Sequence, residues 1–133
     1  MKKLILLVFV MFFSLPGIAS DDSKEKPTQH LQVEDIVTMK NAKEIFLGKT
    51  LEMMEKKNIG LQEASEIHII TYALEKSVAY FAENLEGEKQ LLAKEMAVVV
   101  EDIHLTSENN RLGELQAHIQ KYFNLVDEFL FCF

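Results

Sequence analysis

The fold is decided by residues 111–131, RLGELQAHIQKYFNLVDEFLF. Large apolar side chains recur in this stretch at alternating steps of three and four residues. Because an α-helix makes one turn in about 3.6 residues, side chains at this spacing share one face. The stretch therefore predicts an amphipathic helix, whose apolar face is buried only if other helices pack against it. The residues of this face are Leu112, Leu115, Ile119, Tyr122, Val126 and Phe129.

Three segments before this stretch also carry apolar residues at helical spacing. They predict helices over about 33–57, 62–85 and 88–106. Proline is absent after Pro27 and glycine is scarce, which favours helices over strands. Short connections between helices of similar length make sequential helices antiparallel neighbours. The prediction is an all-α fold, an antiparallel up-down-up-down four-helix bundle; a three-helix core with a loose first helix and a dimer of hairpins are the alternatives.

Two connections carry residues that suit helix ends. Residues 58–60 follow the first predicted helix, and Gly60 is expected to supply a left-handed cap there. Ser107, Asn109 and Asn110 precede the last helix, and their polar side chains are expected to cap it. The connection into the last helix is therefore predicted to be a tight turn.

The first twenty residues have the order of a secretory signal peptide. Lys2 and Lys3 precede an apolar run over 4–13, and small residues follow before Ser20. This run is about half of the ~20 residues that span a bilayer, so cleavage is expected and no stable membrane anchor remains. The mature protein is accordingly expected in the periplasm. The predicted organisation is a cleaved signal peptide over 1–20, a flexible linker over 21–30 and a helical bundle domain over 31–133.

The composition is acidic. The chain of 133 residues has 14 basic and 21 acidic side chains, a formal net charge of −7. Removal of residues 1–20 takes away two lysines and no acid, so the net charge of the mature chain is −9. Proteins bind nucleic acid by neutralising phosphates with Lys and Arg, so nucleic acid is not an expected partner. Cys132 is the only cysteine, which excludes an intramolecular disulfide and a c-type haem attachment site.

The second and third predicted helices bring two histidines together. In a hairpin that turns at 86–87, residues at equal height have numbers adding up to about 172, as His68 and His104 do. At 100° per residue, each histidine lies on the same-handed flank of its apolar stripe, and like flanks face each other in an antiparallel pair. We call this pair, with its polar neighbours, the polar seam. The neighbours are Thr71, Tyr72, Glu75, Glu101, Ser107 and Glu108.

Three interpretations of the polar seam are open. In the first interpretation it is a structural network, in which each histidine bonds to a carboxylate, Tyr72 or Ser107, so that no polar group is buried unpaired. In the second it is a site for a divalent transition metal such as Zn, Ni or Cu. In the third it is a contact that responds to pH. A di-iron oxidase is not expected, because Ser65 stands where a second Glu-x-x-His motif needs glutamate. The candidate metal ligands are His68, His104, Glu75, Glu101 and Glu108.

A second candidate cofactor is b-type haem, held without covalent bonds between a methionine and a histidine as in cytochrome b562-like bundles. Antiparallel packing places Met39 and His118 about two turns apart in height, which disfavours them as opposed ligands. Methionines in such bundles commonly fill the core. The residues considered are Met39, Met53, Met54, Met96 and His118.

Two stretches in the polar seam resemble the signature of a known family. Residues 67–75, IHIITYALE, fit I-H-x-x-T-Y-x-L-E, and residues 101–108, EDIHLTSE, fit E-x-x-H-L-x-S-E. The family comprises small exported proteins of Gram-negative bacteria and is classed as a domain of unknown function, with likeness over about 31–126. The resemblance implies a helical fold and export, and it implies no reaction. The chain departs from the pattern in its longer apolar end and in lacking a Thr-Pro helix start near 61–62.

The sequence does not carry the residue patterns of an enzyme. It has no Ser/His/Asp grouping, Cys–His pair, phosphate-binding loop or basic–aromatic patch, so no enzymatic activity is expected. We interpret the mature chain as a non-catalytic binding or interaction module. The apolar end over 129–133, FLFCF, is the expected surface for a protein partner or for self-association.

Overall fold

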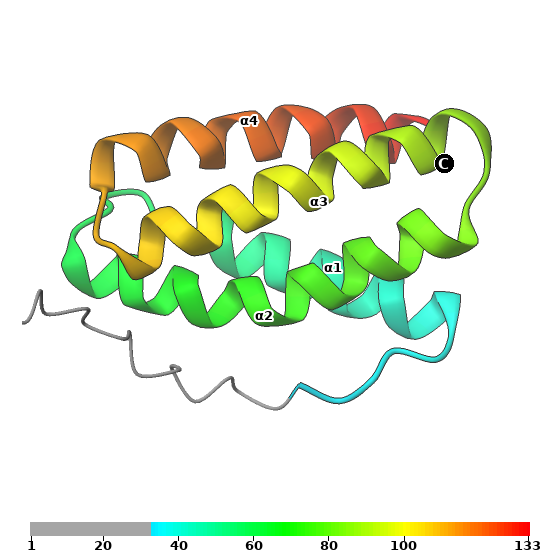
Figure 1. Ribbon diagram of the computed structural model, residues 1–133, viewed down its shortest axis with the longest axis horizontal. Coiled ribbons are helices and arrows are strands. Elements are labelled where there is room, and N and C mark those ends of the chain that lie inside the picture. Colours follow the sequence, from blue (N-terminus) through cyan, green and yellow to red (C-terminus); the bar gives the residue numbers. More distant parts are fainter. Residues whose placement is uncertain (1–32) are drawn as a thin grey trace, which may run out of the picture. The chain divides into compact units, whose positions relative to one another are not determined.

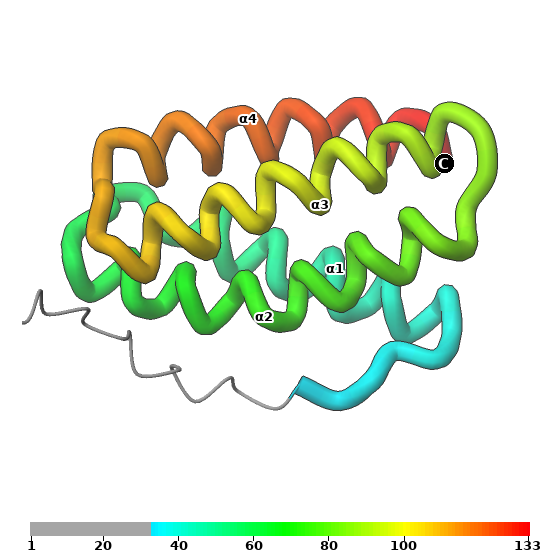
Figure 2. The backbone as a smooth tube through the Cα atoms, viewed as in Figure 1, coloured from blue at the N-terminus to red at the C-terminus, as the bar shows by residue number. Residues whose placement is uncertain are grey.

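Four α-helices make up the computed structural model, which describes residues 33–133 (Figure 1). Each helix packs against the next one and runs in the opposite direction (Figure 2). The predicted all-α, four-helix fold is thereby confirmed. The predicted signal peptide and linker, residues 1–30, lie outside the described residues. The helices are α1 (Met39–Met54), α2 (Leu61–Asn84), α3 (Gly87–Glu108) and α4 (Leu112–Phe131).

Helix α1 begins at Met39, later than its predicted start near Val33. Thr38 is the N-cap, and its hydroxyl oxygen accepts a hydrogen bond from a first-turn amide at 3.1 Å. Residues 33–37 are not helical and are held against α2, where the Lys76 ammonium donates to the Val33 carbonyl. The predicted start was wrong because Thr38 caps the first turn, and the contact with Lys76 holds residues 33–37 outside the helix although they continue the apolar spacing.

Gly60 begins α2 instead of ending α1 with a left-handed cap. Its φ is −101°, outside the left-handed region, and its amide donates to the Glu63 carboxylate at 3.0 Å. This contact is one half of a capping box, so the glycine belongs to the helix that follows it. An ion pair between Lys56 and Glu66 joins the connection to α2. The hydrogen bond between them raises the pKa of Lys56 and lowers the pKa of Glu66.

The turn between α3 and α4 is a Schellman motif. Asn110 has a left-handed φ of 54°. The Arg111 amide donates to the Thr106 carbonyl at 2.9 Å, and the Asn110 amide donates to the Ser107 carbonyl at 3.3 Å. The prediction of side-chain caps from Ser107, Asn109 and Asn110 was wrong, since α4 has no side-chain cap. Backbone amides instead satisfy the carbonyls at the end of α3.

Alanine substitutions at two glycines are expected to have opposite effects on the stability of the fold. Gly87 begins α3 with a φ of +65°, where a Cβ strains its own backbone, whereas Gly113 lies in the first turn of α4 with open space around it. Gly87→Ala is expected to lower the free energy of unfolding by about 1–2 kcal/mol. Gly113→Ala is expected to raise it by about 0.5–1 kcal/mol. Urea denaturation measures the free energy of unfolding of both variants. Effects of the same sign would contradict the left-handed conformation of Gly87 or the helical conformation of Gly113.

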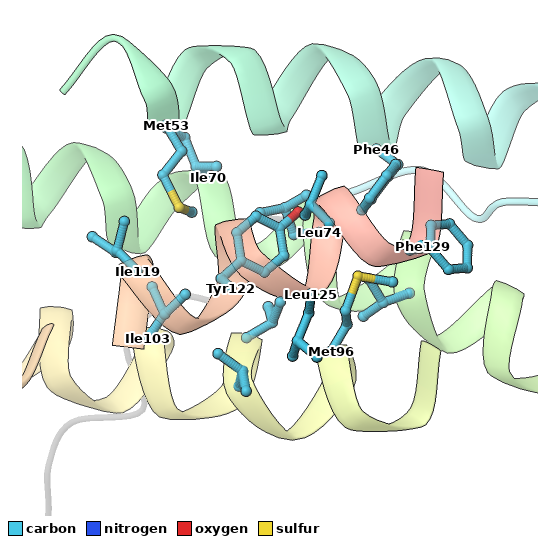
Figure 3. Packing of buried hydrophobic residues seen from close by; sticks show 14 of the residues in the cluster. Phe46, Met53, Ile70, Leu74, Met96, Ile103, Ile119, Tyr122, Leu125 and Phe129 are labelled. Carbon is cyan, nitrogen blue, oxygen red and sulfur yellow. The ribbon is translucent and has the colours of Figure 1, made fainter. Parts of the chain in front are cut away.

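The apolar face predicted for residues 111–131 lies in the core (Figure 3). It packs against apolar residues of the other three helices, including Met53, Leu74 and Met96. Within residues 33–133, no helix is both long enough and apolar enough to cross a bilayer. Leu112 of the predicted face is half-buried, and Leu125, which the predicted face did not include, is buried as well. The buried residues of the predicted face are Leu115, Ile119, Tyr122, Val126 and Phe129.

Long side chains, rather than close backbones, join α1 to α4. The Phe129 ring contacts Phe46 of α1 and Phe81 of α2, with centroids 5.6 Å and 5.2 Å away. The hydroxyls of Thr50 and Tyr122 form a buried hydrogen bond of 2.7 Å. Burial raises the pKa of Tyr122 well above its usual range, so this phenol stays protonated. The backbone of α1 therefore packs on α2, and its contact with α4 depends on these side chains.

Candidate functional site

Two imidazole rings meet between α2 and α3. The ring centroids of His68 and His104 are 4.6 Å apart, and the rings are inclined by 54°. This proximity confirms the predicted register of the hairpin. Ala64 and Ala93 are fully buried, and these small side chains allow α2 and α3, the most extensively packed pair of helices, to approach closely.

Thr71 determines which nitrogen of His104 carries a proton. The Thr71 hydroxyl donates to the His68 carbonyl at 2.6 Å. Because a hydroxyl has one proton, its 3.0 Å contact with His104 Nδ1 requires the second proton to be on that nitrogen. Nδ1 also lies 3.1 Å from Glu75 Oε1. The Nδ1–H group of His104 therefore donates toward both oxygens, and Nε2 is the ring nitrogen that faces away from them.

The other side of the His104 ring faces a second carboxylate. His104 Nε2 lies 3.9 Å from Glu108 Oε2, one helical turn further along α3. The His104 side chain is 13% exposed, and those of Glu75 and Glu108 are 38% and 24% exposed. The imidazole thus lies between two carboxylates in a seam that solvent reaches in part.

Tyr72 packs against both histidines. Its hydroxyl forms a 2.7 Å hydrogen bond with His68 Nε2, and its ring meets the His104 ring edge-on at 5.1 Å. Burial raises the pKa of Tyr72, and the negative charges of Glu108 and Glu75 add to this effect. The phenol therefore stays protonated at neutral pH and keeps its hydrogen-bonding capacity toward His68.

Two predicted members of the polar seam do not reach an imidazole. Glu101 is exposed, and His104 forms its ion pairs with Glu75 and Glu108 instead. The Ser107 hydroxyl donates to the His104 backbone carbonyl at 2.8 Å, so it satisfies the helix backbone and not the ring. The Glu-x-x-His spacing of α3 therefore does not produce a glutamate–histidine pair. Within residues 33–133, no three His, Cys, Asp or Glu side chains form a preassembled metal site.

The residues considered for haem lie in different parts of the bundle. Met53 and Met96 are buried in the core, and Met54 is exposed. Met39 is on α1, which packs on α2, whereas His118 on α4 turns toward α3 and lies 3.9 Å from an oxygen of Asp102. The pairing of His118 with Asp102 is missing from the sequence-based predictions. The hairpin rule that paired the seam histidines would have found it, because these two positions are equidistant from the α3–α4 turn.

The fold and the polar seam define a small four-helix domain with two histidines and two carboxylates at the contact between its central helices. The chain belongs to the family of unknown function DUF6746, whose profile matches residues 1–130. The resemblance to a family of unknown function is confirmed, and the match extends beyond residues 31–126 at both ends. No curated protein matches the chain, and no solved structure does.

Proposed function

We propose that the mature chain is an exported periplasmic module that binds a divalent transition metal at the polar seam and does not catalyse a reaction. The charged, apolar and small residues of the first twenty positions support export. The ligand class follows from the side chains around His104. They are oxygen and nitrogen donors from two helices, in a seam that solvent reaches in part.

The contact between His104 Nδ1 and Glu75 is the observation that carries this proposal. Metal-binding histidines usually donate their second ring N–H to a carboxylate or carbonyl, which fixes the tautomer and orients the ring. Glu75 provides that contact at 3.1 Å and leaves Nε2 as the metal-binding nitrogen. Two ligands of a tetrahedral Zn²⁺ stand about 3.4 Å apart. The 3.9 Å between Nε2 and Glu108 therefore needs a shift of roughly half an ångström.

His68 is the third ligand in this proposal. Its ring lies against His104 and bonds to the Tyr72 hydroxyl through Nε2. Binding then requires His68 to exchange this contact for the metal, at the expense of part of the binding free energy. We therefore expect an affinity of about 1–10 μM for Zn²⁺ or Cu²⁺, weaker than that of a preassembled structural site.

The hydrogen bonds of Thr71 support a non-catalytic role. An activated nucleophile would give its proton to a histidine acting as base. The Thr71 proton goes to a backbone carbonyl instead, and His104 donates to the Thr71 oxygen. The half-buried thiol of Cys132 is the other candidate nucleophile. It follows the last turn of α4, whereas the two histidines that could act as its base lie between α2 and α3.

Isothermal titration of the mature chain with Zn²⁺ tests the metal site. The double variant His68→Ala with His104→Ala is expected to abolish binding. His118→Ala is expected to leave binding unchanged, because His118 is on α4 and lies beside Asp102 rather than in the polar seam. Glu108→Gln is expected to weaken binding about 10-fold by removing a charged ligand. Glu101→Gln on the same helix is the matched control and should have no effect. Unchanged affinity in the double histidine variant would overturn the proposal.

A second candidate function, self-association, is favoured by one side chain at the apolar end. Phe131 is 93% exposed. Within the proposed interaction surface over 129–133, Phe129 is fully buried in the core and Phe133 packs against it with centroids 4.9 Å apart, so Phe131 is the most exposed aromatic side chain of this surface. Aromatic side chains are the usual anchors of protein interfaces, so Phe131 is the residue proposed to contact a second copy.

Sedimentation of the mature chain under reducing conditions tests this second candidate. Phe131→Ser is expected to shift the chain from dimer toward monomer, with the dissociation constant rising at least 10-fold. Leu61→Ser is the control, since Leu61 is also strongly exposed, at 64%, and begins α2 at the other end of the bundle. A monomeric wild-type chain, or equal effects of the two variants, would contradict self-association through Phe131.

A further inference from the structure

The end of the bundle where α4 finishes contains an apolar cavity of about 190 Å³. Its lining comes from α1, α2 and the last residues of the chain, and it includes Phe81, Phe129, Leu47 and Leu130. The one charged residue in the lining is Lys43. An engineered apolar cavity of about 150 Å³ in another protein takes up benzene and stays free of water. The cavity in this bundle is therefore large enough for a phenyl ring or a short alkyl chain.

Positive charge gathers beside this cavity. The ammonium nitrogens of Lys43 and Lys89 each lie 4.3 Å from the centroid of the Phe133 ring. The two ammonium nitrogens are thus no further apart than twice that distance. Among residues 33–133, no ion pair joins either lysine to a carboxylate. An anion beside the two lysines would form charge-assisted hydrogen bonds with them.

We propose that this end of the bundle binds an amphiphilic carboxylate. Its apolar part, about the size of a phenyl ring or of a chain of roughly six carbons, occupies the cavity. Its carboxylate pairs with Lys43 and Lys89 in place of their contact with the Phe133 ring. The site shares no residue with the polar seam, so neither proposal depends on the other.

Titration of the mature chain with octanoate, followed by calorimetry and by NMR of the backbone amides, tests the proposal. Burial of the alkyl chain and the ion pairs predict a dissociation constant of about 1 mM or tighter. The amide shifts are expected around Leu47, Phe129 and Leu130. Octanol and acetate separate the two parts of the ligand, because one lacks the charge and the other lacks the apolar chain. Both are expected to bind at least about 5-fold more weakly than octanoate.

Lysine variants provide the second arm of the test. Lys43→Met and Lys89→Met keep much of the side-chain length and remove the charge, and each is expected to weaken octanoate binding about 5-fold or more. Lys40→Met is the matched control, because Lys40 is on the same helix, is 86% exposed and pairs with Glu44. The proposal is overturned if octanol binds as well as octanoate, or if Lys43→Met and Lys40→Met have equal effects. Amide shifts confined to the polar seam would overturn it too.

Discussion

Phe129→Ala is expected to lower the free energy of unfolding by about 3–5 kcal/mol, the usual cost of removing a buried phenylalanine ring. The Phe129 side chain is fully buried and contacts the rings of Phe46 and Phe81. Its loss leaves a void between α1, α2 and α4, whose lining atoms lose contacts. Domains of this size are stable by about 5–15 kcal/mol in total, so the variant loses a large part of its stability.

Urea denaturation followed by circular dichroism measures this effect. Phe131→Ala is the matched control, since it removes the same ring two positions further along the same helix, where the side chain is exposed. At a protein concentration low enough for the chain to be monomeric, its effect is expected to stay within about 0.5 kcal/mol. A Phe129→Ala effect no larger than about 0.5 kcal/mol, the limit expected for Phe131→Ala, would contradict the burial of Phe129 in the core.

Ala64→Leu is expected to destabilise the fold by about 1–3 kcal/mol through overpacking. Ala64 is fully buried in α2, one helical turn before His68. A larger side chain there forces α2 and α3 apart, because the close approach of the helices depends on small residues. The substitution is therefore also expected to separate the His68 and His104 rings and to weaken Zn²⁺ binding about 10-fold or more.

Ala79→Leu on the same helix is the control for this prediction, because Ala79 is exposed and has room for a larger side chain. Its unfolding free energy and its Zn²⁺ affinity are both expected to stay close to those of the original chain. An Ala64→Leu variant with unchanged stability would show that α2 and α3 are not closely packed at this level. Unchanged Zn²⁺ affinity in a destabilised variant would argue against the polar seam as the metal site.

The parts of the fold that depend on local spacing were predictable from the sequence. The apolar period of residues 111–131 identified the buried face of α4, because helical geometry alone decides which side chains share a face. The hairpin rule paired His68 with His104 for the same reason: once the turn is known, height along an antiparallel pair follows from residue number. Both predictions needed only the geometry of one helix or of two neighbouring ones.

The remaining features depend on contacts that spacing does not determine. Glu75, Glu101 and Glu108 were equivalent candidates in the sequence, and the direction of each side chain decided which two reach His104. The start of α1 depended on a contact between Val33 and Lys76, which are far apart in the chain. The placement of Lys43 and Lys89 around Phe133 also depends on the packing of the helices, since the two lysines come from different helices.

The attachment of α1 to α4 through side chains alone has a consequence for local unfolding. The backbone of α4 packs on α3 and also reaches α2, and α2 and α3 pack on two or more helices, whereas the backbone of α1 packs on α2 alone. To detach, α1 has to leave α2 and to break a few bridging contacts, such as the Thr50–Tyr122 hydrogen bond. Regions with fewer packed neighbours open at lower free energy than the rest of a fold. We therefore expect α1 to be the helix least protected against amide hydrogen exchange, and its departure would bring the Tyr122 phenol into water while the hairpin of α2 and α3 stays intact.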